Sequence, residues 1–350
     1  MLTALIVIIG LAILILGHEA GHFFVAKLFG MKIDEFGFGF PPRIFARRKG
    51  ETEYSFNWLP FGGFVKISGE NDRMFGDMAR LEALPVNEKK RMFFFQAPWR
   101  RAVVIVAGVA VNFLIGWLLI SGTYMVGTAP ALLISGVQPG SPAERAGIMP
   151  GDTVQNYVQA EPFTQFVSGH RGEPIEIELI RGSEKLTIVA TPRTTTQPNQ
   201  GALGVLLTED PGIPRLSLWG ALQAGWREAV LICELVLYSF GQLVKNLVLQ
   251  GSLLEGVVGP VGIFGVAASA GEIGLIYLIK LIALISLNLA VINLLPFPAL
   301  DGGRFLFILI EKTKGSPVPR TIEAWVNAAG FAFLILLMVL LTARDISGWF

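Results

Sequence analysis

Long apolar runs alternate with polar segments along this chain of 350 residues. One run covers residues 2–24, a second covers residues 102–126, and a third covers residues 273–295, with more apolar sequence beyond it. A helix needs about 20 apolar residues to cross a bilayer. The pattern therefore predicts a polytopic α-helical membrane protein with about four transmembrane helices, two of them after residue 273.

The stretch from residue 218 to 248 is harder to assign. Its central part is apolar, but Arg227, Glu228, Glu234, Gln242 and Lys245 interrupt every run of 20 residues. We expect an amphipathic helix at the membrane surface. A fifth span over residues 229–249 is the alternative.

Composition agrees with a membrane protein, because 52% of the residues are hydrophobic and only 16% are charged, which is unusual for a soluble enzyme. The single cysteine, Cys233, excludes an intramolecular disulfide. Residues 27–101 carry 14 Lys/Arg and 9 Asp/Glu, whereas residues 128–215 carry 6 and 9. By the positive-inside rule, the first loop is cytoplasmic and the second lies outside.

Both loops show strand patterns. In the first, residues 36–40 and 52–56 are typical of short strands, and the Phe/Gly run at 36–40 is equally typical of a lipid-anchoring loop. In the second, a strand at 132–134, a turn at 138–142 and a β-hairpin at 175–190 indicate a small α+β domain. Residues 194–200 are typical of a polar linker leading out of it.

Two of the three histidines stand four residues apart in the first apolar run, as His18-Glu19-Ala20-Gly21-His22. On a helix this spacing puts both imidazoles on one face, where they can bind one zinc ion, while Glu19 can reach a water molecule at that metal. The alternative is a pair of histidines that only hydrogen-bond neighbouring helices. We favour the metal site, because ionisable groups inside membranes are rare and usually functional.

A third ligand is expected from the end of the third run, where two prolines, Pro296 and Pro298, precede Asp301-Gly302-Gly303. Prolines unwind a helix, and loose backbone at membrane depth must be enclosed by protein or line a wet cavity. An enclosed carboxylate would complete three zinc ligands. Taken alone, Asp301 is more simply a turn former.

Together these motifs resemble the site-2 proteases, zinc metalloproteases that cut inside membranes, and among them the bacterial regulator-of-sigma-E protease branch in a form with one PDZ domain. The resemblance rests on H-E-x-x-H, on Trp58-Leu-Pro-Phe-Gly-Gly-Phe-Val-Lys66, on the PDZ-like run from Val137 to Asp152, and on N-x-x-P-x-P-x-L-D-G after residue 292. It implies that His18, His22 and Asp301 bind Zn²⁺, that Glu19 is the general base for attack by water, and that Asn293 contacts the substrate or the oxyanion, with Asn288 as a second asparagine of the catalytic site.

The resemblance also implies a domain plan and a biological setting. An N-terminal catalytic membrane half (1–127) with a membrane-associated β-element precedes an inserted extracytoplasmic PDZ domain (128–193), a linker with a surface helix (194–272) and a C-terminal catalytic half (273–350). The implied location is the bacterial inner membrane. The implied substrates are single-pass membrane proteins already cut by another protease, such as anti-sigma factors or signal-peptide remnants, with a peptide or ectodomain bound at the PDZ domain and no nucleic acid partner.

Val109 and Arg304 depart from the family pattern, where a proline and, in some members, a histidine are usual, and we expect altered packing there. Two other classes of protein remain as alternatives. A catalytically silent scaffold would not need the four polar residues of the metal motif, and a metal transporter would be expected to show repeated halves, which this sequence lacks.

Overall fold

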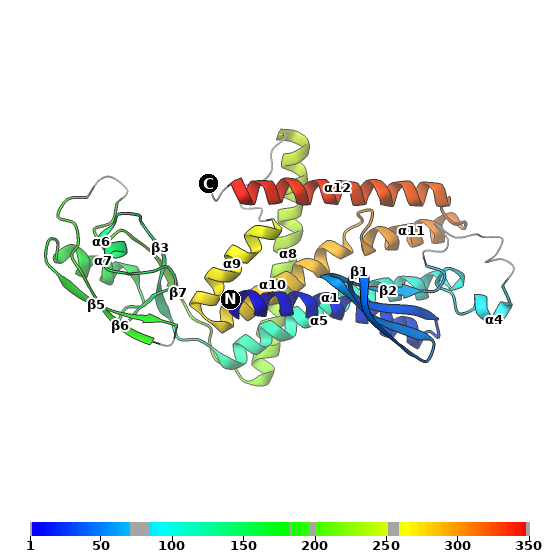
Figure 1. Ribbon diagram of the computed structural model, residues 1–350, viewed down its shortest axis with the longest axis horizontal. Coiled ribbons are helices and arrows are strands. Elements are labelled where there is room, and N and C mark those ends of the chain that lie inside the picture. Colours follow the sequence, from blue (N-terminus) through cyan, green and yellow to red (C-terminus); the bar gives the residue numbers. More distant parts are fainter. Residues whose placement is uncertain (1, 71–83, 183, 197–199, 251–258, 348–350) are drawn as a thin grey trace. The chain divides into compact units, whose positions relative to one another are not determined.

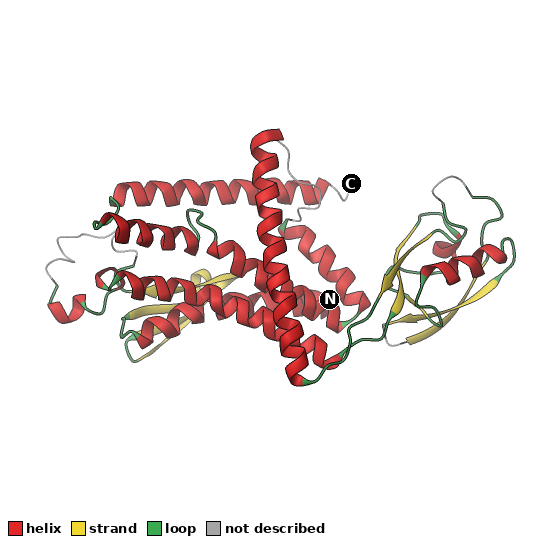
Figure 2. Cartoon of the chain, turned by 180° about the vertical axis from the view of Figure 1, so that it is seen from behind, coloured by secondary structure: helices red, strands yellow, loops and turns green. Residues whose placement is uncertain are grey.

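The computed structural model describes residues 2–70, 84–182, 184–196, 200–250 and 259–347. The chain divides into two compact units. Unit one comprises residues 1–4, 119–226 and 263–281, and unit two comprises residues 5–118, 227–262 and 282–350. Figure 1 labels the helices and strands, and Figure 2 shows that the strands form two separate groups.

Four helices of the described chain are long and apolar enough to cross a membrane, which agrees with the predicted number. They belong to α1 (Leu2–Leu28), α5 (Pro98–Val126), α10 (Leu275–Leu294) and α12 (Arg320–Ser347). All four bury only part of their surface, as expected of helices whose remaining faces meet lipid. These helices support a membrane protein.

Three further helices of 14 residues or more in the described chain lie between these spans. The first, α8 (Leu218–Gln250), is one continuous helix that is not among the four candidates for spans. The other two, α9 (Pro260–Ile273) and α11 (Asp301–Lys314), are not predicted from the sequence. Whether α8 lies on the membrane surface or crosses it stays a prediction.

In the first loop, the strands β1 (Ile33–Lys49) and β2 (Thr52–Ile67) pair with each other. They include both segments that the sequence analysis assigns to strands, and both are much longer than predicted. The first part of β1 has two partners, because Gly37 pairs with both Phe64 and Ser55. The chain after β2 continues through α4 (Val86–Lys89) and the 3₁₀ turn η1 (Phe93–Phe95) to α5.

Unit one contains a five-stranded sheet with the order β6-β5-β4-β3-β7. Its elements are β3 (Ala131–Val137), α6 (Pro142–Arg145), β4 (Thr153–Val154), α7 (Ala160–Gly169), β5 (Ile175–Arg181), β6 (Glu184–Ala190) and β7 (Val205–Asp210). The predicted hairpin is confirmed, because β5 and β6 pair antiparallel.

The predicted end of this domain at residue 193 is too early. Strand β7 pairs with β3 along its whole length, and a bridge between Thr128 and Ile213 closes the domain. Of the linker assigned to residues 194–200, residues 197–199 lie outside the described residues. The chain thus returns to the sheet after that segment, because β3 needs a partner on its second edge.

The core of the sheet comes from alternate strand residues, among them Leu132, Ile134, Ile177 and Leu179, all at most 3% exposed. Glu176 and Glu178 point the other way, as period-2 alternation predicts. One charged group is buried beside this core. The carboxylate of Asp152 is fully buried and accepts hydrogen bonds from the Arg181 guanidinium at 2.7 Å.

Candidate metal centre

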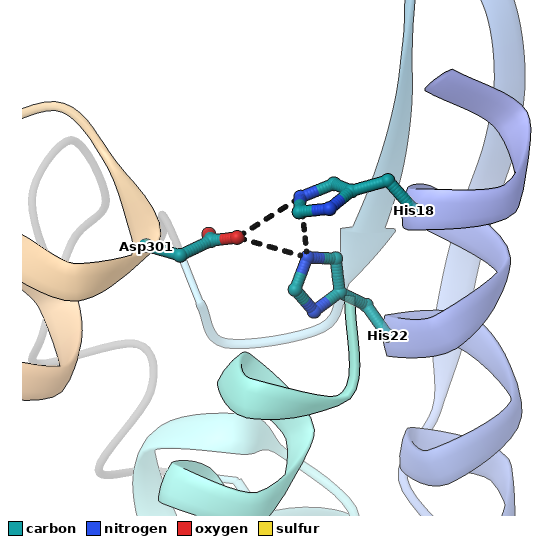
Figure 3. Close-up of side chains that lie close together, drawn as sticks. All are labelled: His18, His22 and Asp301. Carbon is teal, nitrogen blue, oxygen red and sulfur yellow. Dashed lines mark hydrogen bonds and ion pairs between the residues drawn. The ribbon is translucent and has the colours of Figure 1, made fainter. Parts of the chain in front are cut away.

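Three side chains of types that can bind a metal ion meet inside unit two. His18 and His22 project from one face of α1, and Asp301, the first residue of α11, points at both of them (Figure 3). The histidine rings lie edge to face with centroids 4.7 Å apart. All three side chains are at most 15% exposed. Among the described residues, they form the one group of three or more His, Cys, Asp or Glu side chains with metal-site spacing.

The three ligand atoms form a nearly equilateral triangle. Nε2 of His18 lies 3.2 Å from Nε2 of His22, and Oδ2 of Asp301 lies 3.0 Å from the first nitrogen and 3.3 Å from the second. Ligands in a tetrahedral zinc site, about 2.0–2.2 Å from the ion, are about 3.3–3.6 Å apart, close to these distances. The spacing therefore matches three corners of a zinc tetrahedron.

The protonation of His22 leaves the correct nitrogen free for a metal. Its Nδ1 donates a hydrogen bond of 2.8 Å to the backbone carbonyl of Val104, which can only accept. The neutral ring then presents a bare lone pair at Nε2. Oδ2 of Asp301 is also buried and, within the described part of the chain, accepts no hydrogen bond of good geometry. A cation would satisfy this cluster of acceptors.

Asp301 is poised as an anionic ligand. Burial by itself raises the pKa of its carboxyl, but the neighbouring imidazoles of His18 and His22, when they are protonated, hold that pKa well below its usual range through hydrogen bonds and charge. The charged form is the one that binds metal ions.

The double glycine after Asp301 allows α11 to begin against the preceding loop. A Cβ on Gly302 would lie 2.0 Å from the backbone oxygen of Leu295, and one on Gly303 would lie 2.3 Å from that of Phe297. No larger residue fits these positions without moving the helix. The close packing brings Asp301 to the histidines, so the turn that the sequence suggests is instead the first turn of a helix.

Glu19 and the metal ligands share a cavity of about 200 Å³. Its lining includes His18, Glu19, His22, Phe64, Val65, Ile67, Glu70, Val104, Ile105, Asp301 and Arg304. Strand β2 forms one wall, since a Cβ on Gly63 would come within 3.3 Å of Cγ of Glu19. Glu19 therefore borders the metal-ligand cavity without being part of the ligand triangle.

Several residues at this site are not found from the sequence. Gly108 of α5 lies directly under the two rings, where a Cβ would stand 2.4 Å from Nε2 of His22 and 2.9 Å from Cε1 of His18. The sequence feature that could have indicated Gly108 is the presence of small residues on both α1 and α5. Where these helices meet, a Cβ on Gly21 would lie 2.6 Å from the carbonyl oxygen of Ala107. Such close approach requires small residues on both helices.

Arg304 is also at the site, although the sequence suggests only a packing role. Its Nη1 donates a hydrogen bond of 2.6 Å to Glu70 at the cavity wall. Asn288 and Asn293 lie on α10 and are not among the described residues that line the cavity. The amide of Asn288 donates to the Leu284 carbonyl of its own helix. Contact between these asparagines and a substrate stays a prediction.

Comparison with known proteins places these residues in a family. The model of peptidase family M50 matches residues 6–337. The chain belongs to peptidase family M50. A Clostridium perfringens protein whose name describes a zinc metalloprotease is 33% identical to the chain, with 95% of each covered. Zinc metalloprotease RasP of Shouchella clausii is 30% identical, with 97% of each covered. Regulator of sigma-W protease RasP of Bacillus subtilis is 28% identical, with 99% of each covered.

Membership in the M50 family makes this chain a zinc metalloprotease. The scaffold and transporter alternatives are therefore not supported. The residues present suit zinc, because two imidazole nitrogens and one carboxylate oxygen are common zinc ligands and leave a fourth position open, as in catalytic sites. The structural observation that agrees with an ion at this point is that Oδ2 of Asp301 is buried beside two imidazole nitrogens and, among the described residues, forms no hydrogen bond of good geometry.

Proposed function

We propose that this M50 peptidase is an intramembrane endopeptidase that cuts transmembrane segments of single-pass membrane proteins. The observation that carries the proposal is that His18 and His22, two of the three candidate ligands, lie on α1, a candidate membrane span. At 1.5 Å per residue, His18 lies about 24 Å along this helix from its start at Leu2. A metal site at this depth acts on peptide bonds within the bilayer.

In this proposal His18, His22 and Asp301 hold the zinc ion and Glu19 is the general base. Zinc, when bound, polarises a water molecule and the scissile carbonyl. Glu19 accepts a proton from the attacking water and passes it to the leaving amine. Its place in the ligand cavity, beside Gly63, supports this role.

Strand β2 supplies a surface for an unwound substrate. A peptide bond in a helix is shielded by the hydrogen bonds of that helix, so the substrate must become extended before it is cut. Phe64 and Val65 line the metal cavity and pair with β1 on one side. An extended substrate could pair with the other side by β-augmentation.

The Phe/Gly segment of β1 keeps two interpretations. Phe36 packs into the core of unit two, and Phe38 stacks on Phe56 at 5.1 Å, as expected of a structural strand. Phe40 and Phe45 are about half exposed or more, as expected of a lipid anchor. The two roles are compatible, because Phe36 and Phe38 lie in the first part of β1 and Phe40 and Phe45 follow them along the same strand.

The sheet domain of unit one is proposed to be the PDZ domain and to lie outside the cytoplasm. The proposal rests on the run from Val137 to Asp152 and on the charge difference between the loops. Its edge strand β7 faces a neighbouring helix, α7, whose Ala160 amide donates to Glu209. PDZ domains bind peptides at such strand edges.

We propose that this domain excludes substrates with intact ectodomains, so that a first cleavage by another protease is required. To test this exclusion, residues 129–212 are replaced by a short Gly-Ser linker between Thr128 and Ile213, which an antiparallel β-bridge already holds together. The filter predicts that this variant cleaves an untrimmed substrate faster than the full chain does. A folded variant with an unchanged rate would contradict it.

We propose anti-sigma factors as one class of substrate, because the name of the Bacillus subtilis relative describes regulation of sigma-W. Signal-peptide remnants are the second proposed class. The bacterial inner membrane is the proposed location. Asn293 and Asn288 are proposed to contact the substrate backbone, with Asn293 a candidate donor to the developing oxyanion.

The decisive experiment compares wild type with Glu19→Gln in detergent, using a single-pass substrate with a short ectodomain and measuring bound zinc in both. We expect cleavage by wild type alone and equal zinc in both, because the amide cannot accept the proton but Glu19 is not a ligand. Cleavage by both proteins would refute the role of Glu19. His18→Ala should lose both zinc and activity, and its retention of zinc would refute the proposed site.

A further inference from the structure

A buried asparagine stands beside the metal centre. Asn112 of α5 is 1% exposed. Its Nδ2 lies 3.4 Å from Nδ1 of His18, and its Oδ1 is buried with no hydrogen-bond partner among the residues that the structure describes. Leaving a buried amide oxygen unpaired destabilises the folded state. An amide at this position needs a reason other than stability.

Metal binding explains why an amide stands at position 112, because a His18 ring that binds a metal through Nε2 must place its other nitrogen, Nδ1, beside a hydrogen-bond partner. A neutral imidazole that offers Nε2 to a metal carries its proton on Nδ1, and that N–H needs an acceptor. His22 meets the same need through the carbonyl of Val104. For His18, the group found at this place is the side-chain amide of Asn112.

The orientation of the amide follows from this requirement. With a proton on Nδ1 of His18 and the Asn112 Nδ2 facing it, two N–H donors would meet. A rotation of the amide by 180° exchanges Oδ1 and Nδ2 without moving the rest of the side chain. Oδ1 then accepts from the imidazole, so the atom that has no partner gains one when the metal ligand is in its binding form.

Helix packing does not account for the side chain of Asn112. The contact between α5 and α10 uses the Asn112 backbone, whose carbonyl accepts a hydrogen bond of 2.7 Å from the Ser286 hydroxyl. An aliphatic residue would keep that backbone contact. The amide is therefore available for His18.

We propose that Asn112 is a positioning residue for the metal site, whose Oδ1 accepts the Nδ1 hydrogen of His18 and fixes both the tautomer and the ring orientation of this ligand. The inference rests on the proposed function in one respect, namely that His18 is a zinc ligand. Asn112 itself touches neither the metal nor the substrate.

The test measures zinc affinity of the full-length protein in detergent, by competition with a chelator, and the absorption spectrum of the Co²⁺-substituted protein. Asn112→Leu removes the acceptor at nearly constant volume, and Asn112→Asp restores one. Ser286→Ala is the matched control, because it removes a buried hydrogen bond from the same helix contact. His18→Ala reports whether His18 binds the metal at all.

We expect Asn112→Leu to weaken zinc binding about 10- to 100-fold, the usual effect of removing a hydrogen bond behind a histidine ligand. Its Co²⁺ spectrum should change as well, whereas Asn112→Asp and Ser286→Ala should resemble wild type. If Asn112→Leu binds zinc like wild type while His18→Ala does not, the role of Asn112 is refuted and the site stands. If Asn112→Asp is as weak as the leucine variant, the amide acts by packing and the proposal also fails. Normal zinc binding by His18→Ala would refute the ligand assignment itself.

Discussion

Gly108→Ala adds one methyl group beneath the metal centre. The new Cβ would stand 2.4 Å from Nε2 and 2.6 Å from Cε1 of His22, and 2.9 Å from Cε1 of His18. Nonbonded heavy atoms reach their optimum at about 3.5 Å or more. The rings or the helices must therefore separate by about 1 Å.

That displacement sets the size of the effect. Overpacking of this kind costs about 1–3 kcal/mol of stability. Misplacement of reacting groups by about 1 Å can cost about 10²-fold in rate. We expect the zinc affinity and the cleavage rate of Gly108→Ala each to fall by about 10²-fold, with the helix content unchanged.

Gly122→Ala provides the control on the same helix. A Cβ there has no described atom within 4 Å, and replacing glycine by alanine inside a helix is usually stabilising by about 0.5–1 kcal/mol. Bound zinc after dialysis against a weak chelator, thermal unfolding by circular dichroism and cleavage of a single-pass substrate are measured on both variants. Equal zinc affinity and equal activity in the two would refute the argument that the α1–α5 approach determines the metal geometry.

Three further predictions follow from other contacts. Gly303→Ala should lower zinc affinity with little loss of helix content, because the first turn of α11 must move and carry Asp301 with it; chelator competition measures this. Arg181→Met should destabilise the sheet domain by about 3 kcal/mol, since it removes the ion-pair partner of the buried Asp152 carboxylate and leaves that charge with the Met149 amide as a donor. The exposed Arg145→Met serves as its control in thermal unfolding, and an equal effect would contradict the prediction. Chelation should abolish cleavage, and zinc but not magnesium should restore it, because magnesium prefers octahedral oxygen ligands.

Much of the architecture follows from local sequence patterns. The apolar runs predict the four candidate spans, and alternation predicts the β5–β6 hairpin. The spacing of His18, Glu19 and His22 predicts that the two histidines share a helix face, as they do. These features depend on periodicities of 3.6 and 2 residues, which the chain carries within each segment.

Other features depend on residues that are distant in sequence. Strand β7 joins β3 about 70 residues after it, and nothing in the local pattern at residue 193 signals that the chain will return. The helical start of α11 is likewise absent from the sequence predictions. The proline-rich run before Asp301 conceals it.

The sequence alone determined which groups are available for zinc, because residue type and helical spacing are local properties. Only the tertiary structure decided how they are arranged. It brings Asp301 within 3.3 Å of histidines about 280 residues earlier, places Val104 and Asn112 behind their rings, and requires glycine at position 108. These contacts arise from the close packing of α1, α5 and α11, and close packing depends on the shapes of all the segments that meet there.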